Sequence, residues 1–512
     1  MPKNIFAEFE KRVEEYPEKT ALKISANALT YAELYRLASN LSANMSKQGV
    51  ARGDHIGVLL PNSLEYVVLM LAVAKKGAVL VPHNLNLGLE AVERAFNSSD
   101  VKHFVCWHAR IAEIMQRQML PIDSGHLFVS VGKQVIGTSL LSKMMEEDVD
   151  WQPTEAKASD PYILTLTSGS TGQPKPIILS QETKIRRAHI AAEIYGVTDK
   201  DVTITSTPLY HSLAERLVLI PLLTGGTSVV MERFSPAAWL ESVETNAVTF
   251  SILVSSQVKQ VFSGLRPEAG LPESLACLVS SSERLPDEYK NTMKSYGKCQ
   301  FHECYGASEI AIATDLKVGK GAPGTEHSVG VPVPGVAIRI IDTHGKPLEP
   351  GQIGEIACKT PFLFSGYYRQ SEATHTCMAD GYFRTGDLGK LDSEGYLYFV
   401  GRCGDTIKTG GINVYPRDVE EVLLSHQKVE DCAVVGLVDE WFGEIVTAVL
   451  VGDLETTKTL RELRLACLRD LADYQQPRRF FKANALHHTP MGKLDRKKVE
   501  DSVKSGLFEE LQ

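Results

Sequence analysis

Short apolar runs rich in β-branched residues alternate along the chain with longer segments of helical periodicity. Runs such as HIGVLL (55–60), YILTLT (162–167) and VTFSILV (248–254) are typical of buried strands. The segment ETKIRRAHIAAEIYG (182–196) instead spaces its apolar residues as an amphipathic helix does. This alternation predicts an α/β fold with large, mostly parallel sheets. Further strands of the same type are expected at AVLVP (78–82), VTITS (202–206), TSVVM (227–231) and ACLVSSS (276–282).

The pattern changes near residue 400, where glycines crowd a polar stretch that suits a turn or swivel. A compact α+β pattern follows it. We therefore expect a large α/β body with internal subdomains over residues 1–401 and a small, mobile α+β domain over residues 402–512. The elements expected in the small domain are helices at 416–426 and 459–474 and strands at 431–439, 444–452 and 478–486.

The most apolar stretch of the chain is YVVLMLAVA (66–74), which ends at two lysines. It falls well short of the roughly 20 apolar residues that a membrane-spanning helix requires, so we expect a buried helix there and no membrane span. The N-terminal segment 1–20 carries acidic residues and lacks the apolar core of a signal peptide, which argues against secretion.

Charge and cysteine content exclude further classes of protein. The formal net charge of -9 argues against a nucleic-acid-binding surface. The nine cysteines are scattered, with no C-x-x-C pair and no zinc-type spacing, so neither a disulfide framework nor a structural metal site is expected. A reducing, cytoplasmic location fits this cysteine usage.

The loop LTLTSGSTGQPKPIILS (164–180) follows an apolar run with glycines, hydroxyl side chains and one lysine. Glycines allow backbone N–H groups to converge, hydroxyls add donors, and Lys175 adds a positive charge, which together form a cradle for phosphate. A polar surface turn is the alternative for such a loop taken alone. The spacing of a Walker A motif is not met, which disfavours a P-loop NTPase.

Four more motifs accompany this loop, in the order YGASE (305–309), YFRTGDLG (382–389), GRCGDTIKTGGINVYP (401–416) and PMGKLDR (490–496). Together with TSGSTGQPK (167–175), their order and approximate spacing resemble those of the adenylate-forming superfamily, which includes acyl- and aryl-CoA synthetases. The resemblance spans nearly the whole chain.

The resemblance implies an AMP-forming acid–thiol ligase that uses ATP and Mg²⁺. Such an enzyme activates a carboxylic acid to an acyl-adenylate, releases pyrophosphate, and transfers the acyl group to the thiol of coenzyme A. An alternative keeps the first step but delivers the acyl group to the phosphopantetheine of a carrier protein acting in trans. A third reading is an inert nucleotide-binding protein, which is weakened by the joint presence of Lys175, Glu309, Asp387, Arg402 and Lys493.

The same resemblance assigns the nucleotide site. Tyr305, followed by Gly306, is expected against the adenine, with Ser308 at the α-phosphate and Glu309 as the Mg²⁺ ligand. Asp387 and Arg402 are expected at the ribose. The residues expected to hold the β- and γ-phosphates are Thr167, Ser168, Gly169, Ser170, Thr171, Gly172 and Lys175.

The resemblance also assigns the reacting groups and the moving parts. Lys493 is expected between the incoming carboxylate and the α-phosphate, where a cation relieves the repulsion between two anions. His211 is expected at the mouth of the acid pocket, as a gating or orienting group. Gly404 occupies the hinge position, where relatives commonly have Asp or Lys. In the rotated state Gly410 and Gly411 are expected to line the thiol channel, and contacts of Trp441, Arg478 and Arg479 with CoA are weighed against an ordinary surface role.

Departures from the family pattern bear on the acid. Pro176 replaces a glycine after Lys175 and removes one backbone donor. SSSERL (280–285) places Ser281 and Ser282 where small residues line the acid pocket, which predicts a compact or partly polar acid rather than a long alkyl chain. No aspartate stands where amino-acid-activating relatives grip an α-amino group. Glu215 and Arg216 follow His211, and an outward ion pair is favoured for them over recognition of a second functional group on the acid.

Overall fold

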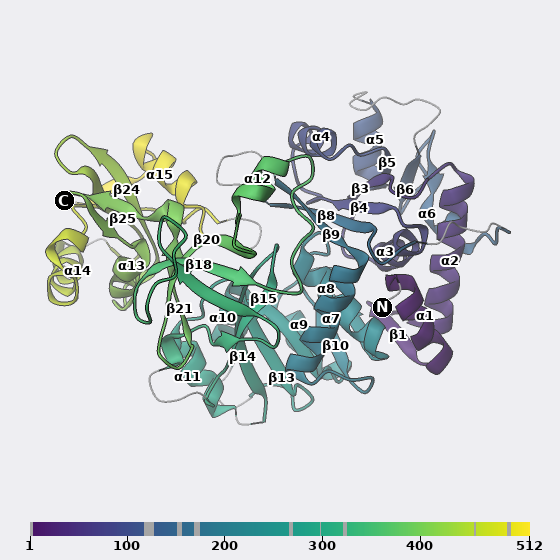
Figure 1. Cartoon of the computed structure of the whole chain (residues 1–512), viewed down its shortest axis with the longest axis horizontal. Coiled ribbons are helices and arrows are strands. Elements are labelled where there is room, and N and C mark those ends of the chain that lie inside the picture. Colours follow the sequence, from purple (N-terminus) through teal and green to yellow (C-terminus); the bar gives the residue numbers. More distant parts are fainter. Residues whose placement is uncertain are drawn as a thin grey trace.

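The computed structural model describes residues 4–116, 127–150, 156–167, 175–265, 270–296, 298–320, 325–454, 457–488 and 493–511. Figure 1 shows a large body, coloured purple to green along the chain, with a smaller unit of helices and strands at its left. The C-terminal end of the chain lies in that smaller unit. The prediction of an α/β fold with mostly parallel sheets is confirmed.

A nine-stranded sheet forms the centre of the large body. Its six inner strands, from β14 to β1, run parallel, and its edges are antiparallel because β15 and β2 return beside their neighbours. In sheet order the strands are β16 (Val331–Pro332), β15 (Ala311–Lys317), β14 (Gln300–Ala307), β13 (Cys277–Ser281), β12 (Phe250–Val254), β10 (Val202–Thr205), β11 (Thr227–Val230), β1 (Thr20–Ile24) and β2 (Asn27–Thr30).

A second sheet of seven strands is parallel except for its last pair, β8 and β9. These two strands flank the glycine-rich segment in the sequence. The strands are β7 (Ser139–Leu140), β6 (Phe128–Val131), β5 (His103–Trp107), β3 (His55–Leu59), β4 (Val79–Pro82), β8 (Pro161–Thr167) and β9 (Lys175–Ser180).

Helices α1, α3, α7 and α8 lie between these two sheets and form with them the main hydrophobic core. α3 packs on β4, whereas α8 packs on β10 and β11, and α1 contacts both α3 and α8. The buried helix expected at 66–74 is confirmed as α3, which Ser63 caps at its start and Gly77 ends in the left-handed conformation. The helices of the body are α1 (Ile5–Glu15), α2 (Tyr31–Lys47), α3 (Leu64–Lys76), α4 (Leu89–Ser98), α5 (His108–Gln116), α6 (Leu141–Glu146), α7 (Gln181–Tyr195), α8 (Ser212–Thr224), α9 (Pro236–Thr245), α10 (Ser255–Gly264), α11 (Asp287–Ser295), α12 (Ser371–Thr376) and the short η1 (Thr325–His327).

A five-stranded antiparallel sheet stands between the nine-stranded sheet and the small C-terminal unit (Figure 1). Backbone hydrogen bonds join Val329 and Gly330, on the nine-stranded side, to Leu397 of this sheet. Its strands are β17 (Ala337–Ile341), β18 (Gly354–Lys359), β19 (Met378–Ala379), β20 (Tyr382–Leu391) and β21 (Leu397–Arg402).

The C-terminal unit is built on a six-stranded sheet with helices α13 (Pro416–Leu424), α14 (Thr457–Asp470) and α15 (Arg496–Lys504). Every helix and strand expected from the pattern after residue 416 has a counterpart here, although the last expected strand is shorter. The boundary at 401/402 stays a prediction. The strands are β22 (Ile407–Thr409), β23 (Ile412–Val414), β24 (Val429–Asp439), β25 (Gly443–Gly452), β26 (Arg479–Lys482) and β27 (Glu509–Leu511), with short helices η2 (Cys403–Asp405) and η3 (Asp473–Gln475).

None of the helices in the described ranges is long and apolar enough to cross a membrane.

Gly330 lies where the nine-stranded and five-stranded sheets meet, and we predict that it tolerates no side chain. Its φ is +92°, and a Cβ there would lie 2.0 Å from the carbonyl oxygen of Asp315. Gly345 has a similar φ of +83° with nothing within 4 Å. Gly345→Ala is therefore expected to cost about 1 kcal/mol, the strain of a left-handed alanine, whereas Gly330→Ala adds a backbone overlap and is expected to exceed about 3 kcal/mol. Urea denaturation followed by circular dichroism measures both, and equal losses would contradict the prediction.

Candidate active site

Tyr305 and Asp387 meet in the interior between the nine-stranded and five-stranded sheets. The Tyr305 hydroxyl donates a hydrogen bond of 2.8 Å to Oδ2 of Asp387, and both side chains are buried. Nε of Arg402 lies 3.5 Å from Oδ1 of the same carboxylate. Burial raises the pKa of Asp387, whereas Arg402 and Tyr305 act in the opposite direction. The sequence-predicted adenine and ribose residues are therefore brought together, and the carboxylate is held in one orientation.

The turn after β14 is fixed by a buried guanidinium. Arg187 of α7 donates to the carbonyl oxygens of Ser308 and Glu309, each at 2.8 Å, and to that of Phe362 at 2.8 and 3.0 Å. Gly306, just before this turn, is also constrained, because a Cβ there would lie 1.8 Å from the Ala311 carbonyl oxygen. These contacts hold the backbone of Ser308 and Glu309 in place, so their side chains project from a rigid base.

Glu309 is paired with a tyrosine. The Tyr367 hydroxyl donates a hydrogen bond of 2.9 Å to Oε1 of Glu309, and Lys175 Nζ lies 5.6 Å from the centre of the Tyr367 ring. The first and last residues expected at the phosphates, Thr167 and Lys175, are opposite one another where β8 pairs with β9. Ser168, Gly169, Ser170, Thr171 and Gly172 lie outside the described residues. Pro176 sits in β9 next to Lys175, and its carbonyl oxygen accepts from the Tyr368 amide.

Lys493 comes from the C-terminal unit and is mostly buried within the large body's candidate site. Burial and the charge of Arg402 lower its pKa, whereas Glu283, Asp387 and Glu309 oppose this shift. The same lysine also contributes to the low pKa of His211, which burial lowers to about 4. His211 is therefore neutral near pH 7, and its Nε2 is buried without a hydrogen-bond partner among the described residues. A cation and a neutral imidazole thus lie in one site with two carboxylates.

The serines expected at the acid pocket lie at and just after the end of β13. Ser281 is the last residue of that strand, and both Ser281 and Ser282 are partly exposed. Ser282 has a φ of +84°, a left-handed conformation that costs a non-glycine residue of order 1 kcal/mol or more. Strain of this kind persists only where surrounding structure enforces it, which marks this segment as tightly constrained.

Glu215 and Arg216 do not form the outward ion pair that the sequence favoured. Both side chains are buried in α8, at 1% and 9% exposure. Glu215 instead pairs with Lys184 of α7 at 2.8 Å, and Lys184 is itself fully buried. The expectation was wrong because α8 is buried all round between two sheets, so it offers no outward face for these residues.

The predicted hinge and thiol-channel residues lie on either side of β22. Gly404 is in η2, and a Cβ there would meet nothing within 4 Å. Gly410 and Gly411 form the turn between β22 and β23, with φ of +56° and +81°. Two successive positive φ values are what a tight two-residue hairpin requires, so these glycines serve the turn as well as leaving its surface bare.

The three residues weighed for CoA contact lie in the C-terminal unit, where Trp441 is 88% exposed. The Arg478 guanidinium lies 3.8 Å from the centre of the Phe442 ring, and Arg479 forms an ion pair of 2.6 Å with Glu510. Their contact with CoA stays a prediction.

Sequence reasoning missed Arg187, Tyr367 and Lys184. Arg187 and Lys184 look like ordinary charged positions of an amphipathic helix, and only the burial of α7 on both sides reveals their role. Tyr367 stands outside the five motifs. The one available signal is the unusual pair of charged residues, Glu215 and Arg216, within the otherwise apolar segment that forms α8.

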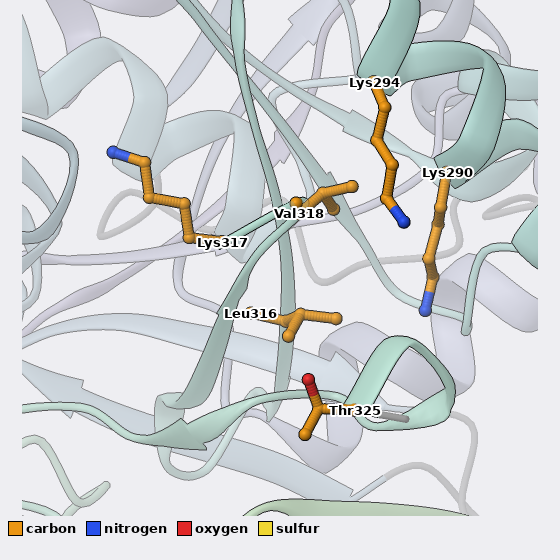
Figure 2. A pocket seen from close by; sticks show the side chains of 7 residues that line it. Lys290, Lys294, Leu316, Lys317, Val318 and Thr325 are labelled. Atoms are coloured by element: carbon orange, nitrogen blue, oxygen red, sulfur yellow. The ribbon is translucent and has the colours of Figure 1, made fainter. Parts of the chain in front are cut away.

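A cavity of about 160 Å³ lies away from this site, beside α11 and β15. Figure 2 shows Lys290 and Lys294 extending from the same helix toward Leu316 and Thr325, whereas Lys317 points away from them. Lys290 forms an ion pair of 2.5 Å with the buried Glu303. The cavity is smaller than the roughly 300 Å³ that pockets for drug-sized ligands start from, so it does not compete as a nucleotide site.

Comparisons with known proteins agree with this arrangement. Residues 9–368 match the family described as AMP-binding enzyme, and residues 418–493 match the AMP-binding enzyme C-terminal domain. The chain is 30% identical over 485 residues to a feruloyl-CoA synthase from an Amycolatopsis species, covering 93% of this chain and 94% of the relative. It is also 30% identical over 501 residues to a 2-succinylbenzoate–CoA ligase from Bacillus velezensis, covering 96% of each.

Solved structures are similar over their full length. ATP-bound MatB from Rhodopseudomonas palustris has a TM-score of 0.87 at 26% identity, covering 98% of this chain and 99% of that one. The O-succinylbenzoate coenzyme A synthetase MenE from Bacillus subtilis, in complex with AMP, has a TM-score of 0.86 at 26% identity, covering 98% of both chains.

The buried pair of Lys184 and Glu215 generates a stability prediction. Glu215→Ala leaves the Lys184 ammonium buried without its carboxylate, and breaking such a pair costs about 3–5 kcal/mol. Glu182→Ala on α7 is the matched control, because Glu182 pairs with Arg186 on the exposed face and such a pair contributes about 0.5 kcal/mol or less. Urea unfolding of the two variants measures the contrast, and a Glu215→Ala loss below about 1 kcal/mol would refute it.

Proposed function

The chain belongs to the family of AMP-binding enzymes and is an AMP-forming acid–thiol ligase, and from this premise we propose which of its residues carry each step. The enzyme activates a carboxylic acid with ATP to an acyl-adenylate and then forms a thioester with coenzyme A. The carrier-protein alternative is not favoured, because the relatives are named as CoA ligases.

In the first step a carboxylate oxygen of the acid attacks the α-phosphorus of ATP, and the bond to the bridging oxygen of pyrophosphate breaks. Both reactants are anions, so the step needs positioning and charge neutralisation more than covalent help from the protein. We assign the neutralising cation to Lys493. The single observation that carries the assignment is that this partly buried ammonium lies within electrostatic range of Asp387, Arg402 and Glu309, the residues expected at the nucleotide.

His211 is assigned to orient the carboxylate. Because its pKa is lowered to about 4, the imidazole is neutral at the pH of the reaction and acts as a hydrogen-bonding group rather than as a second cation. Its buried Nε2 has no partner among the described residues, which leaves it available to the acid.

The nucleotide is assigned to Tyr305, Asp387 and Arg402. A carboxylate fixed by a phenol and a guanidinium accepts hydrogen bonds from two ribose hydroxyls without rearrangement. Lys175, Thr167 and the loop between them, with Ser308 at the α-phosphate, complete the phosphate contacts of the proposal.

Mg²⁺ is part of this proposal, with Glu309 as its ligand. The donor set fits, since a carboxylate held by one hydrogen bond through Oε1 is a suitable hard oxygen ligand. When bound, Mg²⁺ supplies charge neutralisation at the phosphates.

For the second step we propose that the domain of residues 402–512 rotates about Gly404 and withdraws Lys493. The thiolate of CoA then attacks the acyl carbon, and AMP leaves. Gly404 has no side chain to obstruct rotation, and the Gly410–Gly411 turn presents bare backbone to the pantetheine arm.

The chemical class of the acid substrate is inferred from residues of this chain. Relatives of similar identity are named for feruloyl, long-chain-fatty-acid and sulfoacetate substrates, so identity alone does not choose among them. We propose a compact or partly polar acid, supported by Ser281 and Ser282 at the end of β13. A cytoplasmic place of action is also proposed, supported by the nine free cysteines.

Lys493→Ala tests the assignment of the first step. Acid-dependent pyrophosphate release is expected to fall at least about 100-fold, the size of effect seen when one such electrostatic group is removed. Thioester formation from supplied acyl-adenylate and CoA is expected to persist, because Lys493 has left the site by then. Lys498→Ala removes an exposed lysine of the same segment that pairs with Asp495, and it should behave as wild type. Equal loss of both half-reactions in Lys493→Ala would count against the assignment.

The pH profile of adenylation tests the charge of Lys493. The lysine acts as a cation, and its pKa is lowered, so the rate is expected to fall as pH rises through a value below the ordinary lysine pKa of about 10.4. Arg402→Gln removes the nearby positive charge and should move this alkaline limb to higher pH. Stopped-time pyrophosphate assays across the pH range, at saturating ATP and acid, measure the limb, and a shift to lower pH in the variant would contradict the assignment.

A further inference from the structure

Three basic side chains are buried together where α7 packs on α8. The described residues provide hydrogen-bond or ion-pair partners for only two of them. Lys184 has the carboxylate of Glu215, and Arg187 has three backbone carbonyl oxygens. Arg216 is 9% exposed and has no hydrogen bond or ion pair with any described residue. A guanidinium stays charged in proteins, and leaving a buried charge uncompensated is costly. Arg216 is therefore the one cation of this cluster that has neither a hydrogen-bond acceptor nor a counter-charge among the described residues.

The surroundings of Arg216 place it at the end of the sheet where the acid is expected. Its charge acts on the thiol of Cys304, which precedes Tyr305 in β14 and lies next to Ser281. Tyr195 is also close to Arg216 and packs on the rings of Phe250 and His302, at 5.4 and 5.2 Å. The Tyr195 hydroxyl is buried with no oxygen or nitrogen partner among the described residues. Nε of Arg216 and the Tyr195 hydroxyl are thus two buried donors without an oxygen or nitrogen acceptor in the described ranges, and they are close enough for the charge of Arg216 to act on the tyrosine.

Each carboxylate around this place has a basic partner other than Arg216. Glu215 is paired with Lys184, Asp315 with His302 at 2.7 Å, and Glu303 with the buried Lys290. The described part of the chain therefore offers Arg216 no acidic partner, and the missing acceptor is best sought in a ligand.

We propose that Arg216, assisted by the Tyr195 hydroxyl, binds a second anionic group of the acid substrate, so that the enzyme prefers acids with a carboxylate or sulfonate at the far end. This inference rests on the proposed function, which places the reacting carboxylate at His211. His211 is the N-cap of α8, and Arg216 lies five residues later, or about 7.5 Å along the helix axis. One end of the substrate then lies at His211 and Lys493, and the other at Arg216.

The charge of Arg216 discriminates against other acids in two ways. An uncharged tail would leave the guanidinium without a partner, and a long alkyl tail would in addition pack against a buried charge. Sites that are built to hydrogen-bond a substrate group reject analogues that lack the group more strongly than apolar pockets reject an extra methylene. Arg216 is in this sense a specificity-determining residue.

The test compares acids that differ only in the distal charge. Pyrophosphate release is measured with succinate, glutarate and adipate, with their monomethyl esters, and with 3-sulfopropanoate as the sulfonate. At least one dianion is expected to exceed its half-ester in kcat/KM by about 10- to 100-fold, the range expected for hydrogen bonds to a charged group. Arg216→Gln should abolish this ratio chiefly by slowing the dianion. Arg186→Gln, which removes an exposed guanidinium of α7, should preserve it.

Thermal unfolding separates recognition from a structural role and needs no turnover. Because Arg216 is buried without a partner, Arg216→Gln is expected to keep or raise the unfolding temperature of the free protein, whereas loss of a structural arginine would lower it. With AMP present, the preferred dianion should raise the unfolding temperature of the wild type more than its half-ester does, and Arg216→Gln should remove the difference.

The possible outcomes distinguish a failure of the role proposed for Arg216 from a failure of the proposed function. Pyrophosphate release with equal kcat/KM for every dianion and its half-ester would overturn the role of Arg216 and leave the proposed function standing. No release with any acid would contradict the proposed function, and the thermal shifts would then decide the inference alone. Equal shifts with dianion and half-ester, or a destabilised Arg216→Gln variant, would overturn it.

Discussion

The buried guanidinium of Arg187 is the contact on which the geometry of the site depends. It joins α7 to the turn after β14 and to the segment that follows β18 of the five-stranded sheet, through the carbonyl oxygens of Ser308, Glu309 and Phe362. Burial lowers its pKa to about 9, yet the side chain remains charged near pH 7 and is fully engaged. Because one planar group binds three carbonyls from two separate segments, the backbone of Glu309 cannot move independently of the core helix. The rigidity of the backbone that carries Glu309 is therefore set from inside the protein.

The fold was largely readable from the pattern of apolar residues. Parallel strands that are buried on both faces, such as those at 55–60 and 248–254, give continuous β-branched runs, and the apolar segment at 66–74 could only be a buried helix. The pattern of apolar residues did not predict the order of the strands within each sheet. The neighbours β1 and β11 are about 200 residues apart in the chain, and such pairing depends on packing between distant segments rather than on local preference.

The sequence predicted the candidate site residues that belong to the ordered motifs. It did not predict the ones that lie on buried helices outside those motifs. Tyr305, Asp387 and Arg402 stand in recognisable motifs, and the structure brings them together as expected. Arg216 belongs to no motif, and its only signal was a charged pair within an apolar segment, for which an exposed position is the usual expectation. Its inward position follows from the burial of α8 between two sheets, a tertiary effect that overrides the ordinary preference of arginine for the surface.

The contacts that hold the C-terminal unit against the body can be exchanged at small cost. Arg284 reaches across to Glu421 at 2.6 Å, but it also holds Asp287, the first residue of α11, at 2.9 Å, and Glu421 keeps Arg417 within its own helix. When the crossing pair opens, each group keeps its other partner, and because Glu421 is 53% exposed the pair is expected to contribute about 1 kcal/mol or less. This pair therefore adds little to the energy needed for the rotation proposed for residues 402–512, which leaves bound ligands to set the populations of the two proposed orientations. Under that proposal the progress of the reaction itself, through the charge on the nucleotide, is the timing signal for the next conformation.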